Sequence, residues 1–120
     1  MHGVPANLDL TAFHGAPLEQ IALGEHQIQF RFGAERRTEI GVEGHWELRG
    51  PDGALLDQQM ETREREVYRI HVLLSRTVTD SHVNAPRSFA LTFDSGHVLR
   101  VFDDSTHYES FSIQPGDVYV

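Results

Sequence analysis

The sequence of 120 residues contains neither cysteine nor lysine. Without cysteine the chain forms no disulfide, no thiolate nucleophile and no cysteine-containing zinc site. This absence agrees with a reducing compartment, and we expect the cytoplasm. All ten basic residues are arginine, which favours a GC-rich coding sequence and a bacterial source.

Long apolar runs are also missing. No run approaches the roughly 20 residues that a membrane-spanning helix requires. Residues 1–13 lack the basic region and long apolar core of a secretory signal. The sequence therefore predicts a soluble protein with no membrane partner.

The charge is unbalanced, with 18 acidic residues against 10 basic ones and a formal net charge of −8. This field repels the phosphate backbone of nucleic acids and makes a nucleic-acid partner improbable. The same field favours a basic protein partner. A chain of 120 residues with 39% hydrophobic residues has the size of one domain with its own core, residues 1–120.

Two stretches about sixty residues apart, 27–48 and 87–113, share one pattern. Each has an apolar-alternating run, a short turn that contains glycine, and a second apolar run. The first runs are Ile28, Phe30, Phe32 and Phe89, Leu91, Phe93. The second runs are Thr38, Ile40, Val42 and Leu99, Val101, Asp103. The tripeptides His45-Trp46-Glu47 and His107-Tyr108-Glu109 follow, so the chain reads as an internal duplication.

Earlier apolar residues repeat at the same offset. Leu8, Leu10, Phe13, Leu18 and Leu23 match Tyr68, Ile70, Leu73, Val78 and Val83. The pseudo-repeats then span about residues 8–56 and 68–120, with about five strands in each. We predict a mainly β fold, an antiparallel sandwich or irregular barrel, or α+β if a short helix is counted.

That helix is expected within residues 61–74, after a polar linker over 57–63. Val67, Ile70, His71 and Leu74 follow the helical period, with Thr62 placed to cap the helix. A strand is the alternative, because Tyr68, Ile70, Val72 and Leu74 also alternate.

The alternation also assigns faces. Ile28, Phe30, Phe32, Phe89, Leu91 and Phe93 should face the core, whereas Gln27, Gln29, Arg31, Ser88, Ala90 and Thr92 should face outward. Residues 98–102 are apolar on both sides, so Val98 and Phe102 should lie on a covered face or on a contact surface.

Residues that could carry chemistry are few. Serine nucleophile motifs and phosphate-binding glycine loops are absent from the sequence, and we expect no catalytic residue and no cofactor. The densest group of potential metal ligands is Asp103, Asp104, His107 and Glu109. We favour a polar turn there, because the first copy, Glu43-Gly44-His45, keeps only part of the set.

Two binding surfaces are candidates. A cavity between the repeats would be lined by His45, Trp46, His107 and Tyr108, with Glu47 and Glu109 as an acid–base pair if they face it. Glu39, Glu43 and Glu47, with Glu35 before them, would make an acidic outer edge. That edge is either a solvated face that protects an edge strand or a docking surface for a basic partner.

The last third resembles a bacterial family of small β-rich proteins classed as a domain of unknown function. The resemblance covers roughly the last fifty residues, with an F-x-(D/S)-G hairpin at residues 93–96 followed by Tyr108-Glu109-Ser110-Phe111-Ser112-Ile113. It implies an immunity-protein-like role, in which the domain neutralises a toxin made by the same cell, and it supplies no catalytic residues.

Three hypotheses follow. The first is a protein-binding module of the immunity or regulatory kind that acts through Glu39 and Glu43 or through Val98 and Phe102. The second is a small-ligand binder or enzyme that uses the cavity. The third is a homodimer formed through Val98 and Phe102.

Overall fold

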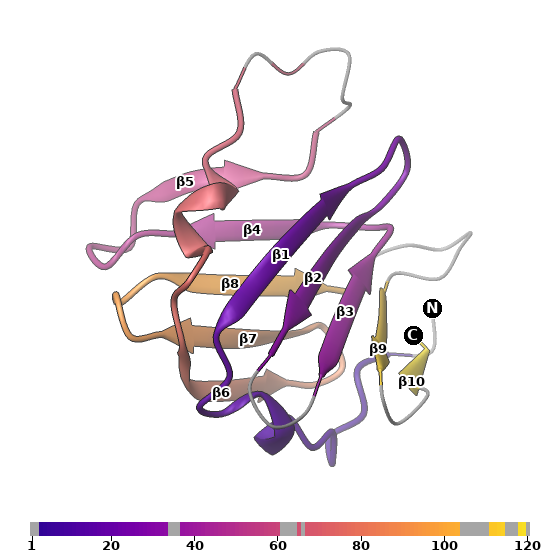
Figure 1. The fold of residues 1–120 in the computed structure, drawn as a ribbon. Coiled ribbons are helices and arrows are strands. Elements are labelled where there is room, and N and C mark those ends of the chain that lie inside the picture. The colour runs from indigo at the N-terminus through magenta and orange to yellow at the C-terminus, as the bar shows by residue number, and fades with distance from the viewer. Residues whose placement is uncertain are drawn as a thin grey trace.

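Two antiparallel five-stranded sheets make up the described part of the chain in the computed structural model, which covers residues 3–33, 37–60, 65, 67–103, 111–114 and 118–119 (Figure 1). In the first sheet the order is β1 (Leu18–Leu23), β2 (Ile28–Phe32), β3 (Thr38–Val42), β9 (Phe111–Gln114) and β10 (Val118–Tyr119). In the second it is β5 (Leu55–Gln58), β4 (Trp46–Arg49), β8 (Val98–Phe102), β7 (Ser88–Phe93) and β6 (Val78–Asn84). The predicted antiparallel β fold is confirmed, as a sandwich that is not closed into a barrel.

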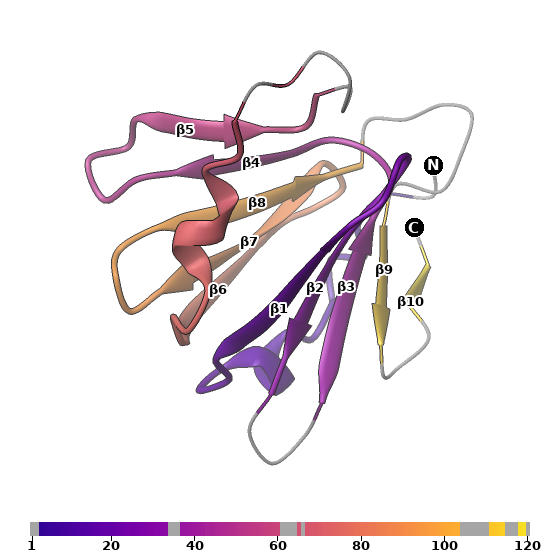
Figure 2. The ribbon, with the colours of Figure 1, turned by 45° about the horizontal axis from the view of Figure 1, so that its top comes forward.

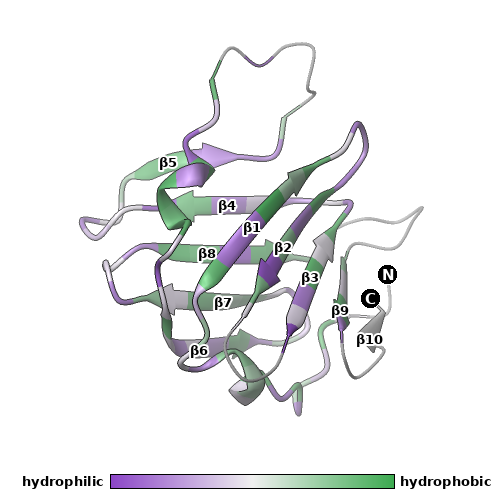
Figure 3. Ribbon diagram, viewed as in Figure 1, coloured by the Kyte–Doolittle hydropathy of each residue, from purple (hydrophilic) through white to green (hydrophobic). Residues whose placement is uncertain are grey.

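The two sheets pack face to face, and the strands of the first run obliquely across those of the second (Figures 1 and 2). Hydrophobic and hydrophilic residues alternate along the strands (Figure 3), as expected when one face of each sheet is buried. The six residues assigned to the core are all buried: Ile28, Phe30, Phe32, Phe89, Leu91 and Phe93. Of the residues predicted to face outward, Ser88 and Ala90 are buried as well.

Each sheet combines three strands from one half of the chain with two from the other. The chain crosses from the first sheet to the second between β3 and β4, over residues 43–45. It returns from the second sheet to the first between β8 and β9. Written from the matching edge, the sheets read β1-β2-β3-β9-β10 and β6-β7-β8-β4-β5, so each half contributes its last two strands to the sheet of the other half.

The halves meet at a bridge between Pro17 and Thr77, which are sixty positions apart. Backbone hydrogen bonds on either side form matching pairs. The amide of Leu18 donates to the carbonyl of Arg76 at 2.9 Å, and the amide of Val78 donates to the carbonyl of Ala16 at 3.0 Å. These bonds join the starts of β1 and β6 at one corner of the sandwich.

The expected helix within 61–74 is wrong for the described residues. Only a 3-10 turn is present, η3 (Ile70–Leu73), and it matches η1 (Thr11–Phe13) of the first half. The turn begins at this point because the Asp57 carboxylate accepts hydrogen bonds from the amides of Arg69 and Ile70. It ends before Ser75, whose φ is +70°. Thr62, the predicted cap, lies outside the described residues.

Within the described ranges, no helix has the length and apolar character needed to cross a membrane.

Candidate functional site

A cleft of about 390 Å³ opens at one end of the sandwich. Three parts of the chain line it: the turn between β1 and β2, the connection from β3 to β4, and the segment that follows β5. The lining residues are Leu23, Gly24, Glu25, His26, Gln27, Ile28, Val42, Glu43, Gly44, Trp46, Gln59, Met60, Arg65 and Tyr68.

The floor of the cleft is apolar, and apolar side chains also lie at its edge. Ile28, Val42 and Trp46 form the floor and are buried, because they point from their strands into the core. Leu23 and Met60 line the cleft on opposite segments and are 52% and 47% exposed. Exposed apolar side chains beside a concave surface are typical of binding sites.

The charge around the cleft is negative. Glu25 and Glu43 line it and are exposed. His26 lies 3.7 Å from Glu25 and adds positive charge only when it is protonated. Arg65 also lines the cleft, but Asp57 compensates its charge.

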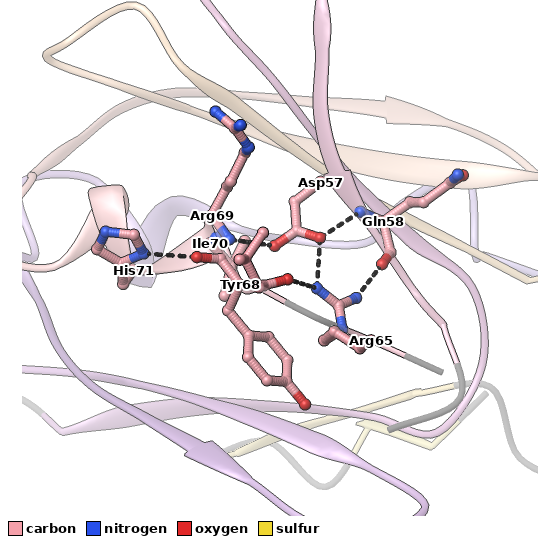
Figure 4. A network of polar contacts seen from close by, with 8 residues as sticks. Asp57, Gln58, Arg65, Tyr68, Arg69, Ile70 and His71 are labelled. Carbon is pink, nitrogen blue, oxygen red and sulfur yellow. Dashed lines mark hydrogen bonds and ion pairs between the residues drawn. The ribbon is translucent and has the colours of Figure 1, made fainter. Parts of the chain in front are cut away.

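Asp57 and Arg65 form a buried ion pair behind the cleft (Figure 4). The Nη1 of Arg65 donates to Oδ1 of Asp57 at 2.7 Å, and the two side chains are 3% and 6% exposed, respectively. Arg65 also donates to the carbonyl oxygens of Gln58 and Val67. These bonds fasten the segment after β5 to the end of that strand, and so they position one wall of the cleft.

The carboxylate of Asp57 is held in its ionised form. Burial by itself raises its pKa, but hydrogen bonds from Arg65 and from the amides of Arg69, Gln58 and Ile70 outweigh burial and hold the pKa below its usual range. This carboxylate is therefore ionised at neutral pH.

The guanidinium of Arg65 also packs against aromatic rings. Its Cζ lies 4.1 Å from the ring centroid of Tyr68 and 5.8 Å from that of Trp46, within the range of cation–π attraction. Its Nε is buried and has no hydrogen-bond acceptor among the residues that the structure describes. Such donors are rare in folded proteins.

The four residues predicted to line a cavity have different places. Trp46 lines the cleft. His45 does not, because its ring stacks on that of Phe102 with the centroids 4.3 Å apart. His107, Tyr108 and the acid Glu109 lie outside the described residues.

The predicted acidic edge is wrong. β3 lies between β2 and β9, so Glu39 is on a central strand, where it pairs with Arg31 at 3.3 Å. Glu47 lies on the second sheet and pairs with Arg49 at 3.0 Å. Glu43, at the end of β3, lines the cleft. Alternation along one strand could not show that the chain changes sheet between Glu43 and Glu47.

Val98 and Phe102 lie on the outer face of β8, as predicted, and both are half-buried. Phe102 is covered in part by His45. It borders a shallow hollow on the outer face of the second sheet, together with Arg49, Arg87 and Arg100. The large exposed hydrophobic side chains of the described residues lie elsewhere.

The metal candidates are not supported by the described residues. Asp103 accepts a hydrogen bond from the amide of Gly3 at 2.6 Å, whereas Asp104, His107 and Glu109 lie outside the described ranges. Within those ranges, no three His, Asp or Glu side chains are grouped so that they could hold a metal ion.

Five exposed apolar side chains line the cleft or lie on the segment between β5 and β6, and we name this set the apolar strip. Its members are Leu23, Met60, Val67, Val72 and Leu74. The described chain between β5 and β6 runs from the cleft along the side of the sandwich, past β1 (Figures 1 and 2). Leu55, at 45% exposure, is the remaining large exposed hydrophobic residue of the described part.

Sequence reasoning missed Asp57 and Arg65. Asp57 was placed in a polar linker, but it belongs to β5 and is buried. A usable signal is the pattern of two apolar residues, Leu55 and Leu56, followed by the acid Asp57, with an arginine eight residues later. The hydrogen bond between His14 Nε2 and Ser81 Oγ, 2.8 Å long, was also missed; it is exposed and ties the loop after η1 to β6.

Comparison of the chain with protein-family models, with curated proteins and with solved structures found no match. The resemblance of the last third to a bacterial family therefore stays a prediction.

Proposed function

We propose that this chain is a protein-binding module of the immunity or regulatory kind, which docks a basic partner on the apolar strip and the adjoining cleft. The observation that carries the proposal is that, of the six large exposed hydrophobic side chains of the described residues, five lie at the cleft or on the segment between β5 and β6. Exposed apolar patches with polar rims mark protein-interaction surfaces more often than chance placement does.

The fold itself does not require these apolar residues. η1 and η3 occupy matching positions, and the exposed residues Val72 and Leu74 of the second half correspond to Ala12 and His14 of the first, at an offset of sixty. The amides of His14 and Leu74 donate to equivalent carbonyls, Thr11 and His71. A small or polar residue is therefore compatible with each site, and the apolar choice in the second half supports a role in binding.

Charge indicates the kind of partner. The strip ends at a cleft bordered by Glu25 and Glu43, and the whole chain carries −8. A basic partner would be attracted to this region and would associate faster than a neutral one. A second copy of the chain is a weaker candidate, because an isologous contact would bring the same carboxylates together.

The strip can be tested by replacing two of its residues with those at the equivalent positions of the first half. Val72→Ala with Leu74→His should abolish stoichiometric co-purification of a basic protein from the cells that make this chain. The matched control is Leu55→Ser, which removes an exposed leucine outside the strip. Equal recovery of the partner by the wild type, the double variant and the control would contradict the proposal. If the wild type is a dimer and only the double variant is a monomer, the strip binds a second copy of the chain instead of a basic partner.

A small-ligand binder or enzyme is the second candidate function, and the cleft beside Trp46 is the observation that favours it. Its volume lies within the range of about 300–1,000 Å³ that is usual for ligand sites. Native mass spectrometry of the gently purified chain distinguishes the two candidates, because a bound small molecule and a bound protein add very different masses.

The matched topology also supports the proposed internal duplication. The register shifts of the two outer hairpins fall at Leu18/Gln20 and at Val78/Asp80, again sixty residues apart. If each half is one copy of an ancestral unit, residues 1–60 alone should form a homodimer that exchanges β4 and β5. Analytical ultracentrifugation checks this, and a folded monomeric half would contradict it.

A further inference from the structure

We propose that the cleft binds the guanidinium group of an arginine side chain, held between the carboxylates of Glu25 and Glu43 and the aromatic residues Trp46 and Tyr68. The inference deepens the proposed function, because the arginine would belong to the basic partner. It rests on residues of the cleft, whereas the strip is tested at Val72 and Leu74, which do not line the cleft, so the two can fail separately.

The cleft selects a cation for a simple reason. Glu25 and Glu43 are exposed carboxylates at its border. The arginine that lines it, Arg65, is bound to Asp57 and is 3% exposed, so it offers little compensating charge to a ligand. An anion entering the cleft would meet two like charges, whereas a cation gains attraction that is strengthened by the apolar floor.

The aromatic wall favours a guanidinium over an ammonium. Arg65 already places its guanidinium 4.1 Å from the Tyr68 centroid and 5.8 Å from the Trp46 centroid. These rings already pack with one planar cation, and Tyr68, which is half-buried, also lines the cleft. A guanidinium stacks on aromatic faces and donates in a planar fork to carboxylates, which an ammonium does not do.

A second observation indicates a peptide. The Nε of Arg65 is a buried donor without an acceptor among the described residues, and its side chain lines the cleft. An arginine residue in a peptide carries both groups that the site lacks: a cation for Glu25 and Glu43, and a main-chain carbonyl oxygen that could accept from this Nε after a small shift of the wall.

The chain contains its own probe. Trp46 is the only tryptophan and lines the cleft, so its fluorescence reports occupancy without a label. The full chain is titrated with N-acetyl-arginine-methylamide and with N-acetyl-citrulline-methylamide, which has nearly the same shape but no charge. We expect saturable binding of the arginine compound with a dissociation constant on the order of millimolar, as suits a single anchor residue. The citrulline compound should bind at least about tenfold more weakly, the effect of one charge-assisted contact.

Variants complete the test. Glu25→Gln and Glu43→Gln should each weaken arginine binding several-fold, and Glu47→Gln, which removes a carboxylate on the other sheet, should not. Equal binding of arginine and citrulline compounds, absence of saturable binding, or no effect of either cleft variant would overturn the inference. Equal binding of N-acetyl-lysine-methylamide would overturn its assignment to a guanidinium.

The outcomes separate this inference from the proposed function. The chain with Val72→Ala and Leu74→His should still bind the arginine compound, because neither residue lines the cleft. If the arginine compound fails to bind but the strip variant loses the partner, only the inference is overturned. If the compound binds but the strip variant keeps the partner, only docking on the strip is overturned.

Discussion

Nη1 of Arg65 lies 2.7 Å from Oδ1 of Asp57, and this buried contact joins β5 to the segment that forms one wall of the cleft. Asp57 also accepts from the amides of Arg69 and Ile70, at 2.8 and 2.9 Å, where η3 begins. One carboxylate thus fixes the cleft wall and the start of the turn that carries part of the apolar strip.

The two partners of this pair should not be equivalent in a stability measurement. Asp57→Asn leaves the buried Arg65 charge uncompensated and turns an amide NH₂ toward existing donors, so it should lower the free energy of unfolding by about 3–5 kcal/mol. Arg65→Met leaves Asp57 with three backbone donors and should cost less, about 1.5–3 kcal/mol. Urea denaturation measures both, and the reverse order would contradict this account.

The same pair predicts a pH dependence. The pKa of Asp57 is lower in the folded chain than in the unfolded one, so its ionised form favours folding. This contribution is complete above the unfolded pKa of about 3.9 and is lost as the pH falls through the lower folded value. Below about pH 4 the wild-type chain should therefore lose stability more steeply than Asp57→Asn.

Urea titrations of the wild type and Asp57→Asn between pH 3 and pH 7 measure the difference in their free energies of unfolding. At pH 7 the contribution of the Asp57 carboxylate is complete, so this pH is the reference. Asp9, whose pKa is lowered by hydrogen bonds from the hydroxyl and amide of Thr11, contributes to both chains alike and cancels. Parallel curves for the two chains in the acid range would show that Asp57 is not the group that titrates.

The core could be predicted from sequence because strand alternation is a local property. Phe30 and Phe32 are separated by one residue, as are Leu91 and Phe93, and side chains two apart on a strand share a face. The partner of a strand is a different matter. Nothing local shows that β3 pairs with β9 rather than with β4, because the pairing depends on the chain changing sheet at residues 43–45.

The cleft wall could not be predicted for a similar reason. The period of residues 67–74 fits a helix, but Asp57 binds the amides of Arg69 and Ile70 and so fixes where the turn begins. A carboxylate that is buried because an arginine eight residues later folds back on it leaves no periodic trace.

Ser75 and Gly15 offer a matched test of backbone strain. They occupy equivalent positions with φ of +70° and +81°, and only glycine adopts this region without a penalty. Ser75→Gly should raise the free energy of unfolding by about 1 kcal/mol, and Gly15→Ala should lower it by about 1–2 kcal/mol. No atom lies within 4 Å of a Cβ at residue 15, so that cost is conformational. If Ser75→Gly shifts the urea midpoint downward, the strain is compensated locally.

Reversal of charge at Glu43 should slow association with a basic partner. Glu39 should not contribute, because it is paired with Arg31 and does not line the cleft. Glu43→Arg should therefore lower the association rate constant by up to roughly tenfold at low salt, with a smaller effect at high salt. Stopped-flow measurement with the partner checks this, with Glu39→Arg as the control. An unchanged rate constant for Glu43→Arg would remove the cleft from the docking surface.

Replacement of Thr38 by valine should stabilise the folded chain. It is 3% exposed, faces the core opposite Phe32 on the neighbouring strand, and its Oγ1 has no hydrogen-bond partner among the described residues. A buried hydroxyl without a partner costs about 1–3 kcal/mol, and valine has nearly the same shape without that cost. Thr38→Val should therefore raise the free energy of unfolding by about 1 kcal/mol. Thr92→Val on the outer face of β7 controls for strand propensity and should change it by less than about 0.5 kcal/mol. A loss of stability in Thr38→Val alone would mean that the hydroxyl is satisfied, and the start of β3 would then be held by a polar contact rather than by packing.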